Sequence, residues 1–528
     1  MRLLLFLLAL MGAEFARAQY QYGCVIDAGS TGSRIYVFRW EARQFAINDM
    51  PPPFTSPFEI VAYSPRDVQT RVDTVVGRQN LIKLLQYAQA KLTEQGVSAD
   101  AMKAAPLYLK ATAGMRVLSD EARVAAMSDV RSILSAGPFM FKPSWARTIS
   151  GEEEGVAGWI AVNLAAGSLP GQSTAPRTTV GALDLGGAST QITFVPPAGV
   201  DILSSQFDLR LTIASQTSLY THSFLYYGQT EAIRRINELV VLSSGAQPGV
   251  PPPAGSTIPH PCYLAGTPGG VSFNSSIAGG LVNFSGTSNW TACREFVSPL
   301  MLRGAQCLTD PKPDSWPHAA APSSVTAMDW AALQRLQRIA PLPVINPVDP
   351  GSSCSIGGQY QAPLVPSSLS SSTDPPVRFV AFSSFSYVYE SLQLSYSAAL
   401  SELRNRSATF CSLDYVSARA SFPSSPFFNE HCIRAVYALT LLVDGYGLDA
   451  SLPGLVTVVP SQPGVSFAMG SMVYEANGLP FSLRQNQPQP TTVIALAVAL
   501  GVVLFGALVS GFVVWRRWPK TSLANNLL

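Results

Sequence analysis

Two similar stretches of sequence decide the fold. Residues 25–33 read Val-Ile-Asp-Ala-Gly-Ser-Thr-Gly-Ser, and residues 182–190 read Ala-Leu-Asp-Leu-Gly-Gly-Ala-Ser-Thr. In each stretch an apolar strand ends at an aspartate, and a turn of small residues then leads into a second strand. The two aspartates, Asp27 and Asp184, are 157 residues apart (184 minus 27). An internal repeat of this kind predicts two related lobes that face one another.

The small residues of both turns suit phosphate binding. Backbone N–H groups cradle a polyphosphate only where the chain approaches it closely, which requires residues with little side chain. One such turn is more often a simple hairpin, but two copies with an aspartate at the same offset favour a phosphate site. Asp27 and Asp184 are placed to hold a divalent cation, directly or through waters. The candidate phosphate-binding residues are Ser30, Thr31, Gly32, Ser33, Gly186, Gly187, Ala188, Ser189 and Thr190.

Two segments between the loops add to this interpretation. Residues 110–116 follow a predicted strand and open a helix, so Thr112 and nearby N–H groups are candidates to contact phosphate. We interpret Arg116 as structural, pairing with an acid to brace the site. Residues 150–155 read Ser-Gly-Glu-Glu-Glu-Gly. Acids at a helix start often only complement the helix dipole, but between two phosphate loops we favour a carboxylate that activates water.

Composition limits the function classes. The chain has 528 residues, of which 47% are hydrophobic and only 13% charged, with 41 Pro and 40 Gly. This length fits two to four domains or one large two-lobed enzyme. The net charge of +2 gives no electrostatic support for nucleic-acid binding. Low charge with abundant Pro and Gly suits a secreted or membrane-tethered protein.

The N-terminus predicts a signal peptide over residues 1–18. Arg2 precedes an apolar run at residues 3–11, and Ala16-Arg17-Ala18 offers a cleavage site. An uncleaved anchor is the alternative interpretation.

The C-terminus predicts a membrane-spanning helix. Residues 493–515 form an uncharged stretch of 23 residues, long enough to cross a bilayer. Arg516, Arg517 and Lys520 follow, which places a short tail, residues 516–528, in the cytoplasm. The topology is then type I, with the body extracellular or lumenal. A buried helix of a globular protein is the alternative.

Cysteines and glycosylation sequons agree with an oxidising compartment. Cys24 lies within an apolar strand and is expected to be a buried thiol, and the six other cysteines allow fifteen pairings. Sequons for N-glycosylation begin at Asn274, Asn283, Asn289 and Asn405.

Hydrophobic periodicity predicts the remaining elements. Strands are expected at residues 25–27, 35–38 and 107–109, and helices at 80–92, 121–134, 399–403 and 434–442. Segments rich in Gly, Pro and Ser, at 243–282, 308–325 and 363–376, are expected to be surface loops outside the core.

Four segments resemble, in order, the conserved regions of the ecto-nucleoside triphosphate diphosphohydrolase (apyrase) family: residues 27–34, 111–116, 151–159 and 182–194. Residues 221–225 and 441–446 match more weakly. The resemblance covers roughly residues 22–480 and implies an α/β fold of two actin-like, ribonuclease-H-like lobes with the active site in the interlobe cleft. The expected organisation is lobe I at 19–160, completed by about 462–482; lobe II at 161–461; and a stalk at 483–492 before the membrane helix.

The resemblance also implies residue roles. Glu154 would be the general base, and Ser189 would help position the attacking water. Asp27 and Asp184 would bind Mg²⁺ or Ca²⁺ through waters. The loops at residues 30–33 and 186–191, which include Gln191, would hold the phosphates together with Thr112. Water would attack the terminal phosphorus in line, with no phosphoenzyme.

Departures from the family concern cysteines and aromatic residues. Tyr226 and Asp349 stand where the family has cysteines. The resemblance therefore implies Cys262–Cys307 and Cys411–Cys432 bridges, with a rewired Cys293–Cys354 bridge as a speculative addition.

The aromatic departures affect the nucleobase. Phe467 stands where the family places a base-stacking Trp, and Ser386 replaces an aromatic residue, with Tyr387 next to it. Phe467 and Tyr387 are the base-stacking candidates, and nucleobase preference stays open.

The sequence thus predicts a divalent-metal-dependent hydrolase of extracellular or lumenal nucleoside tri- and diphosphates, anchored by one C-terminal helix and most simply placed at the cell surface, with a role in purinergic signalling. The alternatives are a Golgi or endosomal nucleoside diphosphatase and a catalytically silent nucleotide-binding ectodomain. A sugar kinase or chaperone ATPase shares the phosphate loops, but the signal peptide argues against both. Nucleic acid is not an expected partner, and homo-oligomerisation and the ATP-to-ADP preference stay open.

Overall fold

The computed structural model describes residues 20–42, 44–45, 59–169, 178–198, 200, 202–212, 215–246, 249–250, 252–253, 255–301, 355–356, 359–362, 364, 376–460, 464–478, 482–483 and 490–517. The chain divides into two compact units. The larger comprises Met1–Glu41 with Pro52–Leu479, and the smaller comprises Ala42–Pro51 with Pro480–Leu528. The larger unit contains both phosphate loops.

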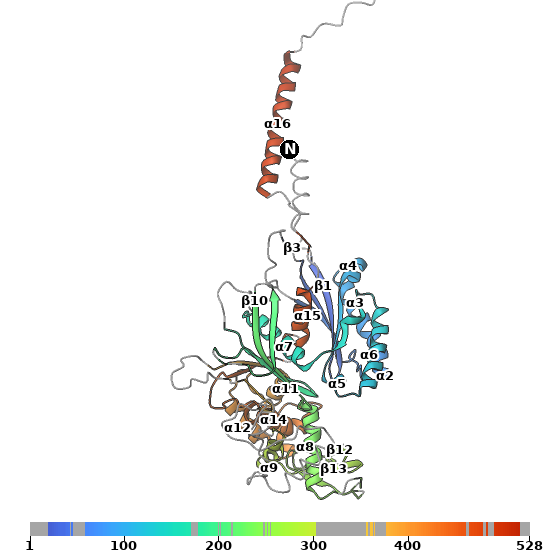
Figure 1. The fold of residues 1–528 in the computed structure, drawn as a ribbon, viewed down its shortest axis with the longest axis vertical. Coiled ribbons are helices and arrows are strands. Elements are labelled where there is room, and N and C mark those ends of the chain that lie inside the picture. Colours follow the sequence, from blue (N-terminus) through green and yellow to red (C-terminus); the bar gives the residue numbers. More distant parts are fainter. Residues whose placement is uncertain are drawn as a thin grey trace, which may run out of the picture. The chain divides into compact units, whose positions relative to one another are not determined.

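The first loop lies in a five-stranded sheet of order β4-β2-β1-β5-β6. These strands are β1 (Tyr20–Ala28), β2 (Ser33–Glu41), β4 (Glu59–Tyr63), β5 (Leu107–Ala111) and β6 (Ala146–Thr148). The helices α3 (Leu81–Glu94), α4 (Ala99–Ala104) and α6 (Asp120–Ser135) cover one face (Figure 1), where Ile26, Leu84 and Val130 share a buried cluster. The predicted strands at 25–27, 35–38 and 107–109 and the helices at 80–92 and 121–134 are confirmed.

The second loop lies in a six-stranded sheet of order β15-β14-β7-β8-β10-β9. Its strands are β7 (Gly181–Leu185), β8 (Ser189–Phe194), β9 (Gln206–Thr212), β10 (Ser215–Leu225), β14 (Phe379–Ser383) and β15 (Val456–Val458). In each sheet, the strand before the loop forms an antiparallel hairpin with the strand after it and pairs in parallel with a third strand: β1 with β2 and β5, β7 with β8 and β14. The repeat seen in the sequence is therefore a repeat of topology.

Two helices, α7 (Gly151–Ala166) and α15 (Phe467–Asn477), pack together between these sheets (Figure 1). Trp159 and Ile160 of α7 share one buried cluster with residues of both sheets and of α15. Ser150 and Glu153 form a capping box at the start of α7, a pattern typically worth about 1 kcal/mol. The first turn of α7 is therefore fixed between the two loops.

The segment 243–282 is folded, contrary to the prediction of a surface loop. It contains β11 (Ile258–His260) and β12 (Val271–Ser275), which join β13 (Gly280–Gly286) in a sheet of order β11-β13-β12. Tyr263 and Ile277 are buried in the core of the second lobe, so the glycines and prolines here mark turns between short strands. The segment 308–325 and most of 363–376 lie outside the described residues.

The helix α8 (Gln229–Ser243) packs against this small sheet. It also belongs to a helical group with α9 (Trp290–Val297), α12 (Leu400–Cys411) and α14 (His431–Thr440), which continues as a π-helix over Leu441–Gly445. The helices predicted at 399–403 and 434–442 are confirmed.

The disulfides correct one prediction. Cys411–Cys432 forms as expected, but Cys262 pairs with Cys293 rather than with Cys307. The backbone N–H of Asn289 donates to Pro261 O and that of Ser288 to Tyr263 O, so the chain after β13 runs beside Cys262 just before α9 begins. This pairing also excludes the Cys293–Cys354 alternative. Cys307 and Cys354 themselves lie outside the described residues, and Cys24 is a buried free thiol, as predicted.

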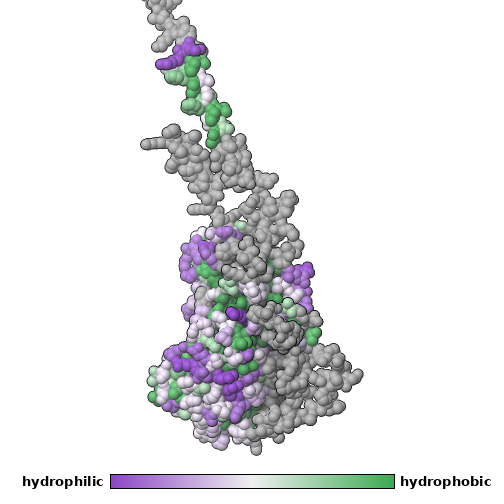
Figure 2. Space-filling model, turned by 90° about the vertical axis from the view of Figure 1, so that its left-hand side faces the viewer, coloured by the Kyte–Doolittle hydropathy of each residue, from purple (hydrophilic) through white to green (hydrophobic). Residues whose placement is uncertain are grey.

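The smaller unit contains a two-stranded pair, β3 (Gln44–Phe45) with β16 (Ser482–Leu483), and the long helix α16 (Pro490–Arg517). Residues Val498–Arg517 of α16 have mean hydropathy 2.4 and no buried share, so the helix is long and apolar enough to cross a membrane. Hydrophobic residues line it in Figure 2. The predicted signal peptide and most of the stalk lie outside the described residues, and the lobe boundaries stay predictions.

Candidate active site

Three buried carboxylates gather where the two repeats meet. Asp27 near the end of β1, Asp184 near the end of β7 and Glu154 in the first turn of α7 are 8%, 6% and 6% exposed. Burial, with a smaller contribution from the negative charge of Glu154, raises the pKa of Asp27 to about 7 and that of Asp184 to about 8, although Arg34 opposes the shift at Asp27. Mutual influence of this kind requires proximity, so the structure brings together three predicted site residues from distant parts of the sequence.

The two phosphate loops have the same turn and face each other. Gly29 N donates to Gly32 O at 3.1 Å, and Gly186 N donates to Ser189 O at 3.0 Å. A Cβ atom on Gly187 would lie 2.5 Å from Ser30 Oγ and 2.7 Å from Thr31 Cγ2. The two loops therefore lie directly against each other at Gly187.

Neighbouring backbone braces both loops. Thr112 N donates to Ala28 O at 3.1 Å, and a Cβ on Gly114 would lie 2.7 Å from Ser30 Cα. Behind the second loop, Gln229 N and Thr230 N donate to Gly186 O and Gly187 O. The structure therefore brings together the predicted phosphate residues Ser30, Thr31, Gly32, Thr112, Gly186, Gly187 and Ala188, which belong to the two facing loops and to the backbone beside them.

Ser33 and Thr190 are turned inward instead. Both are fully buried, and the Thr190 hydroxyl contacts Asp184 O and Tyr446 Oη at 2.7 and 2.8 Å. Thr190 therefore braces the backbone of Asp184 through its side chain.

Glu154 is held by a hydrogen-bond network. Arg116 Nη2 donates to Glu154 Oε2 at 2.8 Å and to Ser189 Oγ at 3.0 Å. Gln191 Nε2 donates to the same two oxygens at 3.0 and 2.8 Å, and to Ser223 Oγ at 3.0 Å. Arg116 pairs with an acid, as we inferred from the sequence, and that acid is Glu154.

This network leaves one hydrogen-bond donor, on Ser189, and one acceptor, on Glu154, for a ligand. Ser189 Oγ accepts two hydrogen bonds, so its own proton is available to donate. Glu154 Oε2 accepts from Arg116 and Gln191, while within the described part of the chain Oε1 accepts none. Burial raises the pKa of Glu154, and the charge and hydrogen bond of Arg116 lower it. The pKa of Glu154 is therefore raised overall, with Arg116 offsetting part of the effect of burial, and Oε1 is the oxygen available to accept a proton.

The carboxylates also fit a divalent cation. Asp184 Oδ1 and Gln191 Oε1 are buried without hydrogen-bond partners, and Arg34 Nη1 lies 3.8 Å from Asp27 Oδ2. Oxygen donors of this type suit Mg²⁺ and Ca²⁺. Among the described residues no three His, Cys, Asp or Glu side chains converge to ligate one ion. The donor set therefore fits an ion held partly through waters.

The two base-stacking candidates differ in exposure. Tyr387, on α11 (Ser384–Ser391), is 41% exposed and interacts electrostatically with Arg34 and Tyr63 of the other sheet. Phe467 is 6% exposed and packs against Ile149 and Ala157. The first residue of α15 thus turns its ring into the contact with α7, and base stacking by Phe467 stays a prediction.

Sequence reasoning missed several residues beside the carboxylates. Arg34 lies directly opposite Asp27 in the β1–β2 hairpin and donates to Gln69 Oε1 at 3.2 Å. The register of the hairpin could have predicted this pairing, because Asp27 and Arg34 flank the same turn. Ser223 was missed because its contact with Gln191 joins two strands whose partners are 32 positions apart.

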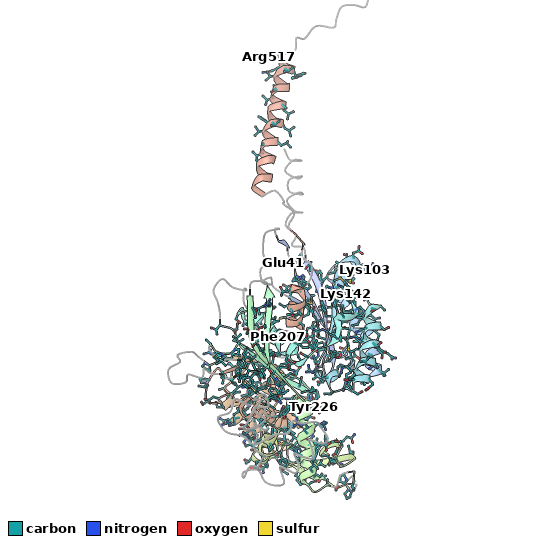
Figure 3. The ribbon with its side chains drawn as sticks, viewed as in Figure 1. Glu41, Lys103, Lys142, Phe207, Tyr226 and Arg517 are labelled. Atoms are coloured by element: carbon teal, nitrogen blue, oxygen red, sulfur yellow. A yellow bond between two sulfur atoms is a disulfide. The ribbon has the colours of Figure 1, made fainter. Side chains whose placement is uncertain are left out.

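A separate cavity of about 50 Å³ lies on another face of α7. Lys110, Arg147, Glu153, Phe207 and Glu475 line it, and Phe207 is labelled in Figure 3. Lys110 pairs with Glu475 and Arg147 with Glu153. Because its charges are paired and none of the three carboxylates lines it, this cavity is not the active site.

The sequons lie at the surface of the second lobe. Asn274, Asn289 and Asn405 are exposed and Asn283 is half-buried. Asn289 Oδ1 accepts from Ala292 N and caps α9. Their glycosylation stays a prediction.

Two facing phosphate loops with a braced carboxylate between them define a phosphate-transferring or phosphate-hydrolysing enzyme of the actin-like type. The profile of the GDA1/CD39 (nucleoside phosphatase) family matches residues 14–314. Human ectonucleoside triphosphate diphosphohydrolase 2 is 28% identical over 490 residues, covering 87% of this chain and 83% of that protein. Ectonucleoside triphosphate diphosphohydrolase 8 of Gallus gallus is 30% identical over 444 residues, covering 81% and 77%. The chain belongs to the GDA1/CD39 (nucleoside phosphatase) family.

A solved structure supports the fold. The crystal structure of nucleoside triphosphate hydrolases from Neospora caninum matches with TM-score 0.58 and 16% identity, covering 90% of this chain and 96% of that chain. The predicted family, the two-lobed actin-like fold and the enzyme class, nucleoside triphosphate diphosphohydrolase, are confirmed.

Proposed function

We propose that this chain hydrolyses nucleoside tri- and diphosphates to monophosphates and phosphate, with Glu154 as general base. One observation carries the proposal: Glu154, ion-paired to Arg116, lies in the first turn of α7 between two facing phosphate loops. A binding site alone needs the loops but not a buried, braced carboxylate with one free oxygen.

The residues divide the work of positioning and proton transfer. Amides of the loops at Ser30–Ser33 and Gly186–Ala188, with Thr112, orient the phosphates. Ser189 donates a hydrogen bond to the attacking water, and that water donates one proton to Glu154 Oε1. This arrangement leaves a lone pair of the water directed at the terminal phosphorus for in-line attack. The proton passes to Glu154, and no phosphoenzyme forms.

Members of this family in general use divalent cations. Asp27 and Asp184 would hold Mg²⁺ or Ca²⁺ through waters. The bound ion supplies positive charge that stabilises the phosphoryl oxygens. Because burial raises the pKa of both aspartates to near neutrality, the ion must compete with protons for them.

The remaining parts of the proposal concern the nucleobase and the location. Tyr387 offers an exposed ring for the base, while Phe467 offers none. The helix α16 would anchor the body as a type I protein at the cell surface, with its active site outside the cytosol and its tail inside. The complete Glu154 network argues against a catalytically silent ectodomain.

A phosphate-release panel tests this function. Membranes from cells expressing the full chain are supplied with ATP, ADP, UDP or GDP, with Mg²⁺ or Ca²⁺, or with excess EDTA. We expect phosphate release from tri- and diphosphates that requires the cation. Full turnover in EDTA would contradict the metal role, and no release from any nucleotide would contradict the activity.

A further inference from the structure

Arg235, on α8, is a fully buried arginine with no part in the proposed chemistry. Its exposure is 0%, and it is among the largest side chains that the fold encloses completely. Nη1 donates to Tyr226 O at 3.0 Å, while Nε and Nη2 have no hydrogen-bond partner among the described residues. Because a guanidinium stays protonated in proteins, a positive charge is enclosed here, and its one hydrogen bond within the described part of the chain goes to a neutral carbonyl.

An enclosed charge of this kind does not serve the stability of the fold. A buried charge is unfavourable unless it is paired and fully hydrogen-bonded. Replacing buried charged groups with apolar side chains of similar volume is often neutral or stabilising. Methionine would fill the same space without this penalty, so fold stability alone does not explain an arginine at position 235.

The groups that Arg235 contacts lie directly behind the second phosphate loop. Tyr226, labelled in Figure 3, accepts the hydrogen bond from Arg235 at its carbonyl oxygen, and its own N–H donates to Ala188 O at 2.8 Å. The guanidinium also lies over the Tyr227 ring, 4.7 Å from the ring centroid. One arginine therefore holds two consecutive residues of the turn between β10 and α8.

The segment 226–228 lies tightly against the loop. A Cβ atom on Gly228 would lie 2.3 Å from Ala188 N and 2.4 Å from Ser189 N. Tyr226 has φ 70°, in the left-handed region that bulky residues rarely adopt. Such a conformation persists only where the surrounding structure holds it. Arg235 holds the Tyr226 peptide at its carbonyl, and Ala188 O holds it at its N–H.

We propose that Arg235 is a positioning residue for the second phosphate loop: by fixing the segment 226–228, it holds the backbone at Ala188 in the arrangement that binds the phosphates of the substrate. The inference rests on the proposed function, in which this loop orients the phosphates. The proton-accepting carboxylate of Glu154 is held by other side chains. Loss of Arg235 should therefore weaken substrate binding more than it slows the chemical step.

Kinetics and thermal unfolding of the same variants test this role. Arg235→Met removes the charge and keeps an unbranched side chain, and Arg235→Lys keeps a donor for the Tyr226 carbonyl without the planar fork. Arg234→Met is the matched control, because Arg234 is the preceding residue of α8, pairs with Glu231 and is 33% exposed. Full-length chains in detergent are assayed for KM and kcat with ATP at saturating cation, and their thermal unfolding midpoints are recorded.

We expect Arg235→Met to raise KM for ATP about 10-fold, the size that corresponds to losing one hydrogen bond from a charged group, while kcat stays within about threefold. The same variant should unfold at or above the wild-type temperature, because the unpaired charge is gone. Arg235→Lys should give an intermediate KM, and Arg234→Met should match the unchanged chain. A residue that served the fold alone would instead lower the unfolding midpoint and leave KM unchanged.

A folded Arg235→Met chain with the wild-type KM would overturn the positioning role. An Arg235→Met chain that unfolds below the wild-type temperature, or does not fold, would also overturn it, because the arginine would then serve stability. Absence of phosphate release by the unchanged chain would instead overturn the proposed function. The two failures are therefore distinguishable.

Discussion

Replacing Arg116 with methionine removes the charge that lowers the pKa of Glu154. The ion pair joins Arg116 Nη2 and Glu154 Oε2 at 2.8 Å, with side chains 14% and 8% exposed. With charge centres about 4 Å apart and an effective dielectric constant of about 20, the attraction is about 4 kcal/mol. One pH unit corresponds to about 1.4 kcal/mol. Gln191 still donates to Glu154 Oε2, so we expect the acid limb of the rate profile to move up by about one to three pH units.

The assay is the pH dependence of kcat/KM for ATP between pH 5.5 and 9.5 at saturating cation. Arg116→Met should lose most activity at acidic pH and recover much of it at alkaline pH, where Glu154 ionises without its partner. Arg123→Met is the matched control, because Arg123 forms an exposed pair with Asp120 on α6. A loss of equal size at every pH would refute the reasoning, since it would show that Arg116 does not act through the charge of Glu154.

Three further predictions follow from the structure. Gly187→Ala should lower kcat/KM for ATP by about 100-fold, because its Cβ would lie 2.5 Å from Ser30 Oγ and push the two loops apart. A Gly187→Ala variant with the wild-type kcat/KM would contradict the facing-loop geometry. Gly470→Ala should destabilise the fold by about 3 kcal/mol, because its Cβ would lie 1.7 Å from Ala157 O. Chemical denaturation compares it with Gly464→Ala, whose Cβ would have nothing within 4 Å, and equal stabilities of the two variants would contradict the α7–α15 contact. In EDTA the free energy of unfolding should fall from pH 5.5 to pH 8, because burial raises the pKa of Asp184 to about 8 and that of Asp27 to about 7, so the folded chain binds more protons than the unfolded chain in this range. Asp184→Asn should make this fall shallower, with Asp27 accounting for the rest, and identical pH profiles for the two proteins would count against it.

The repeat was predictable because it is encoded locally. An apolar strand, an aspartate and a turn of small residues lie within nine positions in each copy, and the hairpins form among these same residues. Glu154 could also be predicted as a site residue, because a capping serine, three acids and an apolar helix follow one another directly in the sequence. Each of these signals depends on neighbouring residues only.

The contacts that complete the site could not be predicted from neighbouring residues. Arg116 reaches Glu154 across 38 positions and Ser189 across 73, so its partner is known only once the lobes are folded. For Cys262 and Phe467, the resemblance to a family predicted a role from the position of each residue in the sequence. It predicted neither the cysteine that pairs with Cys262 nor the direction in which the Phe467 ring points.

The most direct test of the central claim is ATP and ADP hydrolysis by Glu154→Gln, compared with Glu152→Gln two residues earlier in the same helical turn. Both full-length variants are first shown to unfold at the wild-type temperature. We predict that Glu154→Gln loses at least about 100-fold in kcat for both nucleotides, while Glu152→Gln stays within about twofold of the unchanged chain. A folded Glu154→Gln variant that hydrolyses ATP and ADP at the wild-type rate would contradict the assignment of Glu154 as the base.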